Sequence, residues 1–263
     1  MTARMAKRAQ QIAPFHVMRI LQQARELEAQ GRSIIHMEIG EPDFASPATV
    51  IRAGKQALDE KRTHYTAANG LPELRDAIAN QYSEQVMIDA QRIIVTPGAS
   101  GALQLVMATL LDPADGIMMA DPGYPCNRHI ASLFNADVQA VAVNQETDYQ
   151  LSAELVERNW RDNTRVVLIA SPSNPTGTLI SPEQLSEIYH LVQDKGGVLI
   201  VDDIYQGLVY YQQVPLALSY GDQLFVIYSF SMFFGMTGWR VGWLVVPDHY
   251  IEVANRLAKN MFL

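Results

Sequence analysis

The side chains of this sequence that could do chemistry lie directly after apolar runs, where small, polar or charged residues take over. One such segment, Pro97-Gly98-Ala99-Ser100, follows Thr96 and opens a run with helical periodicity. Free backbone N–H groups and the helix dipole suit such a turn to binding a phosphate, with the Ser100 hydroxyl as a further donor. A plain joint between a strand and a helix would use the same residues, and this segment alone does not decide between the two.

Two other apolar runs are followed by loops that contain an aromatic ring in one case and a side-chain amide in the other. Tyr124, in DPGYP (121–125), could present its ring face to a planar ligand, although a tyrosine among turn residues is more often a packed loop aromatic. Asn174 lies in SPSNPTG (171–177), where two prolines restrict the backbone and one X-Pro bond is a candidate for the cis form. A polar turn without a ligand is the alternative for this loop.

A carboxylate and a guanidinium complete the set. Asp202 directly follows a buried apolar run, a costly position unless the carboxylate meets a cation such as a protonated ring nitrogen. The alternative is an aspartate that caps the next helix, which Asp203 could do equally well. Arg240 offers a two-pronged donor to a phosphate, or else forms a structural ion pair. Together these groups suit a planar, phosphorylated, nitrogen-containing ring.

The elements that must hold these residues alternate between strands and helices. Strands are predicted at 92–96, 116–120, 138–143, 165–170, 198–202, 224–229 and 241–246. Helices are predicted at 100–111, 125–134, 153–160 and 182–195, and a last one begins near His249. This alternation indicates crossover connections and a mostly parallel sheet covered on both faces, with ligands beyond the carboxyl ends of the strands.

The N-terminal part of the chain has a different pattern. Helical periodicity predicts a helix over residues 15–30, and Ser33–Met37 is predicted as a short strand. Ser46 is predicted as the N-cap of a helix that starts at Pro47 and runs to about residue 60. A further helix is predicted over residues 72–85.

Composition excludes several classes of protein. The 263 residues are 48% apolar and 18% charged, which is an ordinary globular composition, and the net charge of −8 argues against binding nucleic acid or an anionic membrane. The single cysteine, Cys126, excludes an internal disulfide and a cysteine-rich zinc site, so no metal site is predicted. The sequence has no secretory signal and no apolar run of membrane-spanning length, so the location expected is cytoplasmic.

The motifs, taken in order, resemble the class I/II aminotransferases of the pyridoxal-phosphate fold type I superfamily. The resemblance is carried by GEPDF (40–44), HYTAANGLPELR (64–75), TPGASGAL (96–103), DPGYPCNRH (121–129), SPSNPTG (171–177), VDDIY (201–205) and SFSMFFGMTGWRVGW (229–243). It implies an α/β fold with a mostly parallel, seven-stranded sheet between helices. Residues 1–45 would be an N-terminal arm, helix and strand of an incomplete small domain. Residues 46–263 would be the large cofactor-binding domain, ending in the helix that leads to a missing C-terminal domain.

The resemblance also implies a cofactor, pyridoxal 5′-phosphate, and a role for each matching residue. The cofactor phosphate would be held by Gly98, Ala99, Ser100, Ser229 and Arg240, and the pyridine ring and its substituents by Tyr124, Asn174, Asp202 and Tyr205. Gly40 would approach the substrate carboxylate through its backbone. Tyr65 would reach the phosphate of a neighbouring subunit, which implies a homodimer with shared active sites acting on an amino acid and a 2-oxo acid.

Two departures from the family pattern bear on activity. Met232 occupies the position of the family's Schiff-base lysine, and a thioether can neither hold the cofactor aldehyde nor carry a proton. The chain also stops before the segment that carries the family's carboxylate-binding arginine. We therefore expect this chain to be an aminotransferase with impaired catalytic activity. The alternatives are a non-catalytic cofactor-binding or regulatory homologue and a carbon–sulfur lyase of the same fold.

Overall fold

The computed structural model describes residues 4–210 and 214–263 and divides the chain into two compact units, Met1–Ala45 and Ser46–Leu263. In the first unit, α1 spans Lys7–Gln11 and α2 spans His16–Ala29, which confirms the helix predicted there. The strand predicted at Ser33–Met37 is wrong, since these residues are in an irregular conformation. Ile35 and Met37 are more than four-fifths exposed, and a strand does not form without a neighbour to share its hydrogen bonds.

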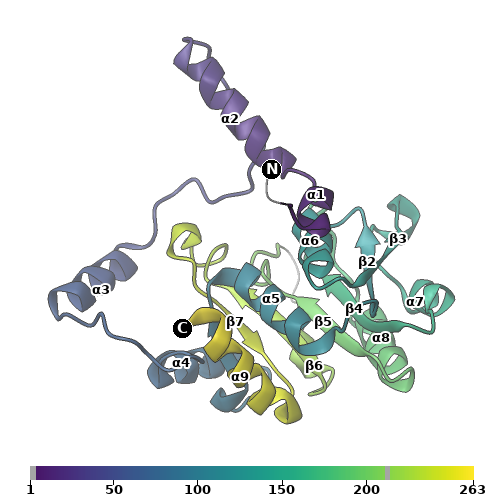
Figure 1. The fold of residues 1–263 in the computed structure, drawn as a ribbon. Coiled ribbons are helices and arrows are strands. Elements are labelled where there is room, and N and C mark those ends of the chain that lie inside the picture. The colour runs from purple at the N-terminus through teal and green to yellow at the C-terminus, as the bar shows by residue number, and fades with distance from the viewer. Residues whose placement is uncertain (1–3, 211–213) are drawn as a thin grey trace. The chain divides into compact units, whose positions relative to one another are not determined.

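The second unit is built on one seven-stranded sheet, as predicted (Figure 1). Its strands are β1 (Ile93–Thr96), β2 (Gly116–Asp121), β3 (Asp137–Ala142), β4 (Thr164–Ala170), β5 (Val198–Asp202), β6 (Leu224–Ser229) and β7 (Gly242–Val245). They lie in the order β1-β7-β6-β5-β4-β2-β3, and only β7 runs antiparallel to its neighbours. The segment between β6 and β7 contains no crossover helix, so the chain reverses direction there.

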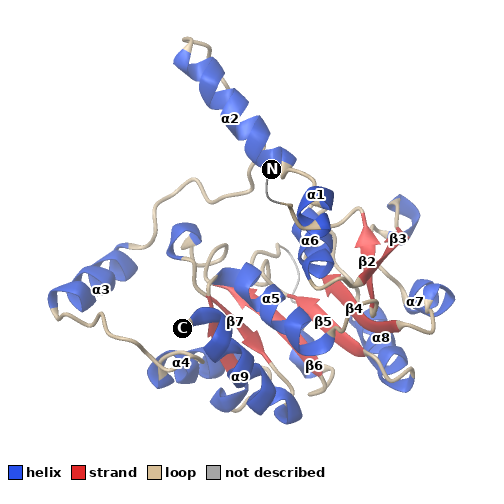
Figure 2. Ribbon diagram, in the orientation of Figure 1, coloured by secondary structure: helices blue, strands red, loops and turns tan. Residues whose placement is uncertain are grey.

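Helices cover both faces of this sheet (Figure 2). The helices of the unit are α3 (Ala48–Asp59), α4 (Pro72–Tyr82), α5 (Gly98–Leu110), α6 (Pro125–Leu133), α7 (Ala153–Asn159), α8 (Pro182–Asp194) and α9 (Ile251–Phe262). One core packs α4, α7 and α8 against the sheet, and the other packs α5, α6 and α9 against the opposite face. Because successive strand residues face opposite ways, Val226 lies in the first core and Ile227 in the second. The near-continuous apolar strands of the sequence follow from burial on both faces.

The helix predicted after Pro47 is present as α3, but its cap is not the one predicted. The N-cap residue is Pro47, which makes no side-chain cap. The Ser46 hydroxyl instead donates a hydrogen bond to the carbonyl oxygen of Gly235 at 2.8 Å and accepts one from Nε1 of Trp239 at 3.0 Å. These distant partners take the hydroxyl away from the helix terminus. Within the described residues, no helix is long and apolar enough to cross a membrane.

Candidate active site

The register of the sheet brings the predicted site residues together at one edge. Thr96, the last residue of β1, and Ser229, the last residue of β6, are both paired with Gly242, the first residue of β7. The carboxyl ends of β1 and β6 therefore lie on either side of the start of β7. In the adjacent strands, Asp202 is paired with Ala170, the last residue before the Asn174 loop. The loops after β1, β6, β5 and β4 therefore open on the same edge, where ligands of parallel sheets bind.

The first turn of α5 and the side chain of Arg240 form a candidate phosphate site. The helix starts at Gly98 without a side-chain cap, so the backbone N–H groups of Gly98, Ala99 and Ser100 have no acceptor within the helix. A Cβ atom on Gly98 would lie 2.4 Å from Nη2 of Arg240, which places the guanidinium directly against this turn. The arrangement combines a helix N-terminus with a cation and suits an anion. Among the described residues, no carboxylate pairs with Arg240, so the structural ion pair considered above is not formed.

Ser229 and Met232 lie in the turn that follows β6. The Ser229 hydroxyl is fully buried, lies 2.8 Å from the Ser231 hydroxyl and accepts a hydrogen bond from the Ser231 N–H at 3.0 Å. The carbonyl oxygen of Met232 accepts the N–H of Gly235 at 3.0 Å, and the methionine side chain is partly exposed. The backbone at Met232 is thus fixed by a hydrogen-bonded turn.

Asp202 and Asp203 are both buried at the end of β5. Oδ1 of Asp202 accepts a hydrogen bond from the N–H of Ile204 at 3.2 Å, and no cation pairs with either carboxyl group among the described residues. Burial raises the pKa of Asp202 to about 6, and burial together with the charge of Asp202 raises the pKa of Asp203 to about 7. The cap alternative is wrong, because turns rather than a helix follow at 204–207.

Tyr124, Asn174 and Tyr205 lie in the loops that follow β2, β4 and β5 at this edge of the sheet. Nδ2 of Asn174 donates a hydrogen bond to the Tyr205 hydroxyl at 3.2 Å, although the two residues come from loops after different strands. Burial raises the pKa of both tyrosines, while the Asn174 amide partly offsets this rise at Tyr205. Both X-Pro bonds of the Asn174 loop are cis.

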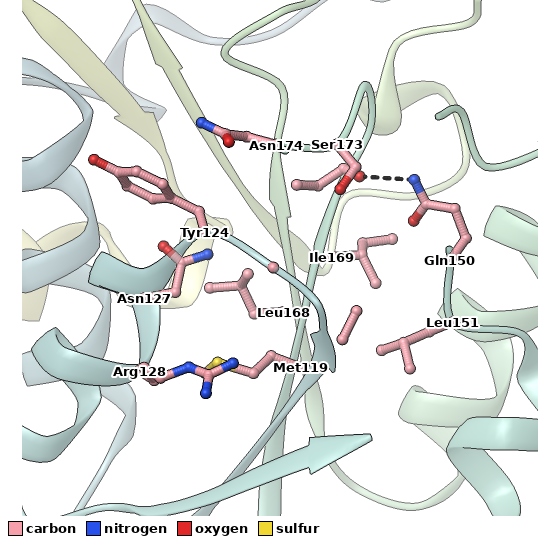
Figure 3. A pocket seen from close by; sticks show the side chains of 13 residues that line it. Met119, Tyr124, Asn127, Arg128, Gln150, Leu151, Leu168, Ile169, Ser173 and Asn174 are labelled. Atoms are coloured by element: carbon pink, nitrogen blue, oxygen red, sulfur yellow. Dashed lines mark hydrogen bonds between the residues drawn. The ribbon is translucent and has the colours of Figure 1, made fainter. Parts of the chain in front are cut away.

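Sequence reasoning missed two residues beside this group (Figure 3). Asn127, on α6, lines a cavity of about 20 Å³ together with Tyr124 and Asn174, and its Oδ1 is buried without a hydrogen-bond partner. Gln150, which also lines this cavity, is buried. Its amide donates hydrogen bonds to the carbonyl oxygens of Ala170 and Thr178 at 3.1 and 2.9 Å. Because these two residues lie on either side of Asn174 in the sequence, the bonds fix the Asn174 loop. Asn127 lies in the same motif as Tyr124, which could have signalled it. No pattern in the sequence singles out Gln150.

Two further predicted residues, Gly40 and Tyr65, are exposed. Gly40 belongs to the first unit, and Tyr65 is 93% exposed.

Comparison with known proteins places this geometry in a family. The family model for aminotransferase class I and II matches residues 32–263. A valine–pyruvate aminotransferase of Mycobacterium tuberculosis is 36% identical over 99% of this chain and 68% of its own length. A (5-formylfuran-3-yl)methyl phosphate transaminase of Methanocaldococcus jannaschii is 33% identical over 98% of this chain and 68% of its own length.

Solved structures agree with the sequence relatives. An aminotransferase from Mycobacterium tuberculosis has a TM-score of 0.96 at 35% identity, over 99% of this chain and 68% of that one. The aspartate aminotransferase of Thermus thermophilus has a TM-score of 0.94 at 27% identity, over 99% of this chain and 69% of that one. The chain belongs to the class I and II aminotransferases, a family of pyridoxal-phosphate-dependent transferases, and has their α/β fold.

Proposed function

We propose that this chain binds pyridoxal 5′-phosphate at the carboxyl edge of its sheet, in a site built for moving an amino group between an amino acid and a 2-oxo acid. The observation that carries the proposal is the close approach of Arg240 to the first turn of α5. Free N–H groups at a helix N-terminus beside a guanidinium fit a phosphate, and a buried carboxyl group without a cation fits a protonated ring nitrogen.

Each residue of the site would then have one task. Gly98, Ala99 and Ser100 would bind the phosphate through backbone N–H groups, with Arg240 completing the charge and Ser229 supporting it. Asp202 would accept a hydrogen bond from the ring nitrogen and keep it protonated. Asn174 and Tyr205 would donate to the phenolic oxygen, and Tyr124 would pack on the ring. When bound, the cofactor supplies the electron sink that amino transfer requires.

Met232 limits what the site can do. A thioether cannot bond covalently to an aldehyde, and it has no proton to exchange with a reacting carbon. The cofactor would therefore be held by non-covalent contacts alone, and amino transfer would be slower by at least about 100-fold, the usual contribution of a positioned acid–base group. The same residue favours a second function, a non-catalytic protein that binds the cofactor.

Cofactor titration followed by borohydride reduction and mass spectrometry tests this proposal. The native chain should bind pyridoxal phosphate, as seen by absorbance, without a stoichiometric covalent label. Met232→Lys should acquire one label, on the peptide that carries position 232, and should convert the cofactor to its amine form with amino acids. Failure of the native chain to bind would overturn the cofactor site. A loaded Met232→Lys variant that is inert towards a broad amino-acid panel would favour the non-catalytic function.

Two copies of the chain would share the site. The apolar residues of α3 lie on one helical face, yet no residue of this helix is buried, and Leu58 is 68% exposed. The exposed Tyr65 follows this helix and would reach the partner's phosphate. Leu58→Glu should convert a dimer to a monomer in sedimentation, whereas Gln56→Glu, which alters the polar side of α3, should leave the dimer intact. An unchanged Leu58→Glu dimer contradicts this interface.

The remaining assignments follow from the family. Residues 1–45 would form part of a small domain, and residues 46–263 would form the large cofactor domain. We also propose a cytoplasmic location, which suits a chain with one cysteine.

A further inference from the structure

The Ser46 hydroxyl, which does not cap α3, is bonded to both ends of the turn that precedes Arg240. It donates a hydrogen bond to the carbonyl oxygen of Gly235 at 2.8 Å and accepts the indole N–H of Trp239 at 3.0 Å. Gly235 and Trp239 are four positions apart in the segment between β6 and β7, so one side chain joins the two ends of a single turn. We call these two hydrogen bonds the serine clamp.

The ring of Trp239 also contacts α3. A Cβ atom on Gly54, within this helix, would lie 2.7 Å from Cη2 and 3.1 Å from Cζ3 of the indole. Glycine inside a helix is otherwise unfavourable, because its backbone loses more freedom on folding than that of alanine. Here the missing side chain leaves the space in which the indole lies.

The backbone bonds of the clamped turn are long. The N–H of Met236 donates to the carbonyl oxygens of Phe230 and Ser231, both at 3.2 Å, and the N–H of Trp239 donates to the carbonyl oxygen of Met236 at 3.2 Å. These distances are at the upper end of the range for N–H···O bonds. The side-chain contacts of Ser46 and Trp239 therefore add to a turn that its own backbone bonds hold weakly.

Arg240 directly follows this turn. Its backbone is left-handed, with a φ of +56°, which is uncommon for a residue that has a side chain. Its Nη1 donates to the carbonyl oxygen of Thr237 at 3.0 Å, and its Nη2 lies where a Cβ atom on Gly98 would be. The place of the guanidinium thus depends on the backbone of residues 237–240, and the clamp holds that backbone at Trp239.

We propose that Ser46 and Trp239 are positioning residues: they hold the turn before Arg240 so that its guanidinium meets the first turn of α5. Both act through Arg240, and neither is assigned a contact with the ligand. The effect on cofactor binding rests on the proposed function, whereas the effect on the turn does not.

Three substitutions disturb the clamp in different ways. Ser46→Ala removes the hydroxyl, Trp239→Phe removes the indole N–H but keeps an aromatic ring, and Gly54→Ala places a methyl group where the indole lies. Each should weaken the binding of pyridoxal phosphate at least about threefold, as expected for the loss of one or two partly exposed hydrogen bonds. The Gly54→Ala result is the most specific, because alanine normally favours a helix over glycine.

Two matched controls make the same chemical changes without touching the contacts of the clamp. Ser83→Ala also removes a hydroxyl, but one that donates to the nearby carbonyl oxygen of Asn80. Gly238→Ala also adds a methyl group to a glycine, at a position where a Cβ atom meets nothing within 4 Å. Both controls should bind pyridoxal phosphate with the native affinity. Native affinity in Ser46→Ala and Gly54→Ala as well would overturn the proposal.

A double-mutant cycle tests whether the clamp acts through Arg240. In an Arg240→Met background, Ser46→Ala should cost little further affinity for pyridoxal phosphate, because the guanidinium that the clamp positions is already gone. An equal loss in both backgrounds would show a general structural effect and overturn the proposal.

Hydrogen exchange of the cofactor-free protein, followed by NMR, gives a readout that needs no ligand. The indole N–H of Trp239 and the backbone N–H of Met236 should exchange at least about threefold faster in Ser46→Ala than in the native chain. Unchanged exchange of both groups would overturn the role of the clamp in the turn. Faster exchange in Ser46→Ala, together with no binding of pyridoxal phosphate by the native chain, would overturn the proposed function alone.

Discussion

The guanidinium of Arg240 fills the space that a side chain at position 98 would occupy. A Cβ atom on Gly98 would lie 2.4 Å from Nη2 and 3.0 Å from Cζ of Arg240, so the guanidinium reaches the first turn of α5 only because residue 98 has no side chain. Arg240 is held there by a hydrogen bond from its Nη1 to the carbonyl oxygen of Thr237 at 3.0 Å. Two segments more than 140 positions apart in the sequence thereby form one anion site.

Gly98→Ala should weaken cofactor binding while leaving the fold intact. The added methyl group must displace Arg240, and the φ of +70° at this position is itself unfavourable for alanine. We expect the affinity for pyridoxal phosphate to fall at least about tenfold in a fluorescence titration. Gly196→Ala is a matched control, since its φ is +71° and a Cβ atom there meets nothing within 4 Å. Equal losses in both variants would argue against the Arg240 contact.

The stability of the cofactor-free protein should depend on pH through Asp202. Its pKa is about 6 in the folded chain and near 3.8 when unfolded, so between these values the folded state binds more protons. Folding therefore becomes less favourable as the pH rises from about 4 to 6. Asp202→Asn should gain stability over the native chain across this window, by up to about 3 kcal/mol in urea unfolding. A difference that does not change with pH would show that Asp202 is ionised in the folded protein throughout.

Tyr82→Phe should destabilise the sheet core. The buried indole Nε1 of Trp243 donates to the Tyr82 hydroxyl at 3.0 Å, and removing this acceptor leaves a buried N–H unpaired. We expect a loss of about 1–3 kcal/mol, measured by thermal or urea unfolding. Tyr65→Phe, at an exposed position, should have almost no effect. A stable Tyr82→Phe variant would mean that another group satisfies the indole.

His36 should titrate at a raised pKa. Its ring nitrogens lie 2.7 Å from Glu38 and 3.0 Å from Glu28, and hydrogen bonds to these carboxylates, Glu38 first, raise the pKa of His36 above 6.5. The stabilising effect is complete below pH 6.5 and is lost as the pH rises through the folded-state pKa. NMR titration should show the pKa falling towards 6.5 in Glu38→Gln. An unchanged pKa in that variant would contradict the pairing.

Most of the fold follows from local sequence patterns. All seven strands were predicted, because each is a short apolar run bounded by turn residues, and alternation with helices indicates a mostly parallel sheet. The motifs after the strands likewise predicted that Asn174, Asp202 and Arg240 share one edge, since the carboxyl ends of parallel strands lie together. These features depend on periodicity and connection order, which the amino-acid sequence alone determines.

Only the tertiary structure decided which polar groups meet. Ser46 binds Gly235 and Trp239 instead of capping α3, and Gln150 supports the Asn174 loop from an irregular segment. The segment at Ser33–Met37 stays irregular despite its strand-like residues. A hydroxyl, an amide or a strand edge bonds whatever partner the fold brings within about 3 Å, and that partner can come from anywhere in the chain. Spacing along the sequence cannot reveal such a partner.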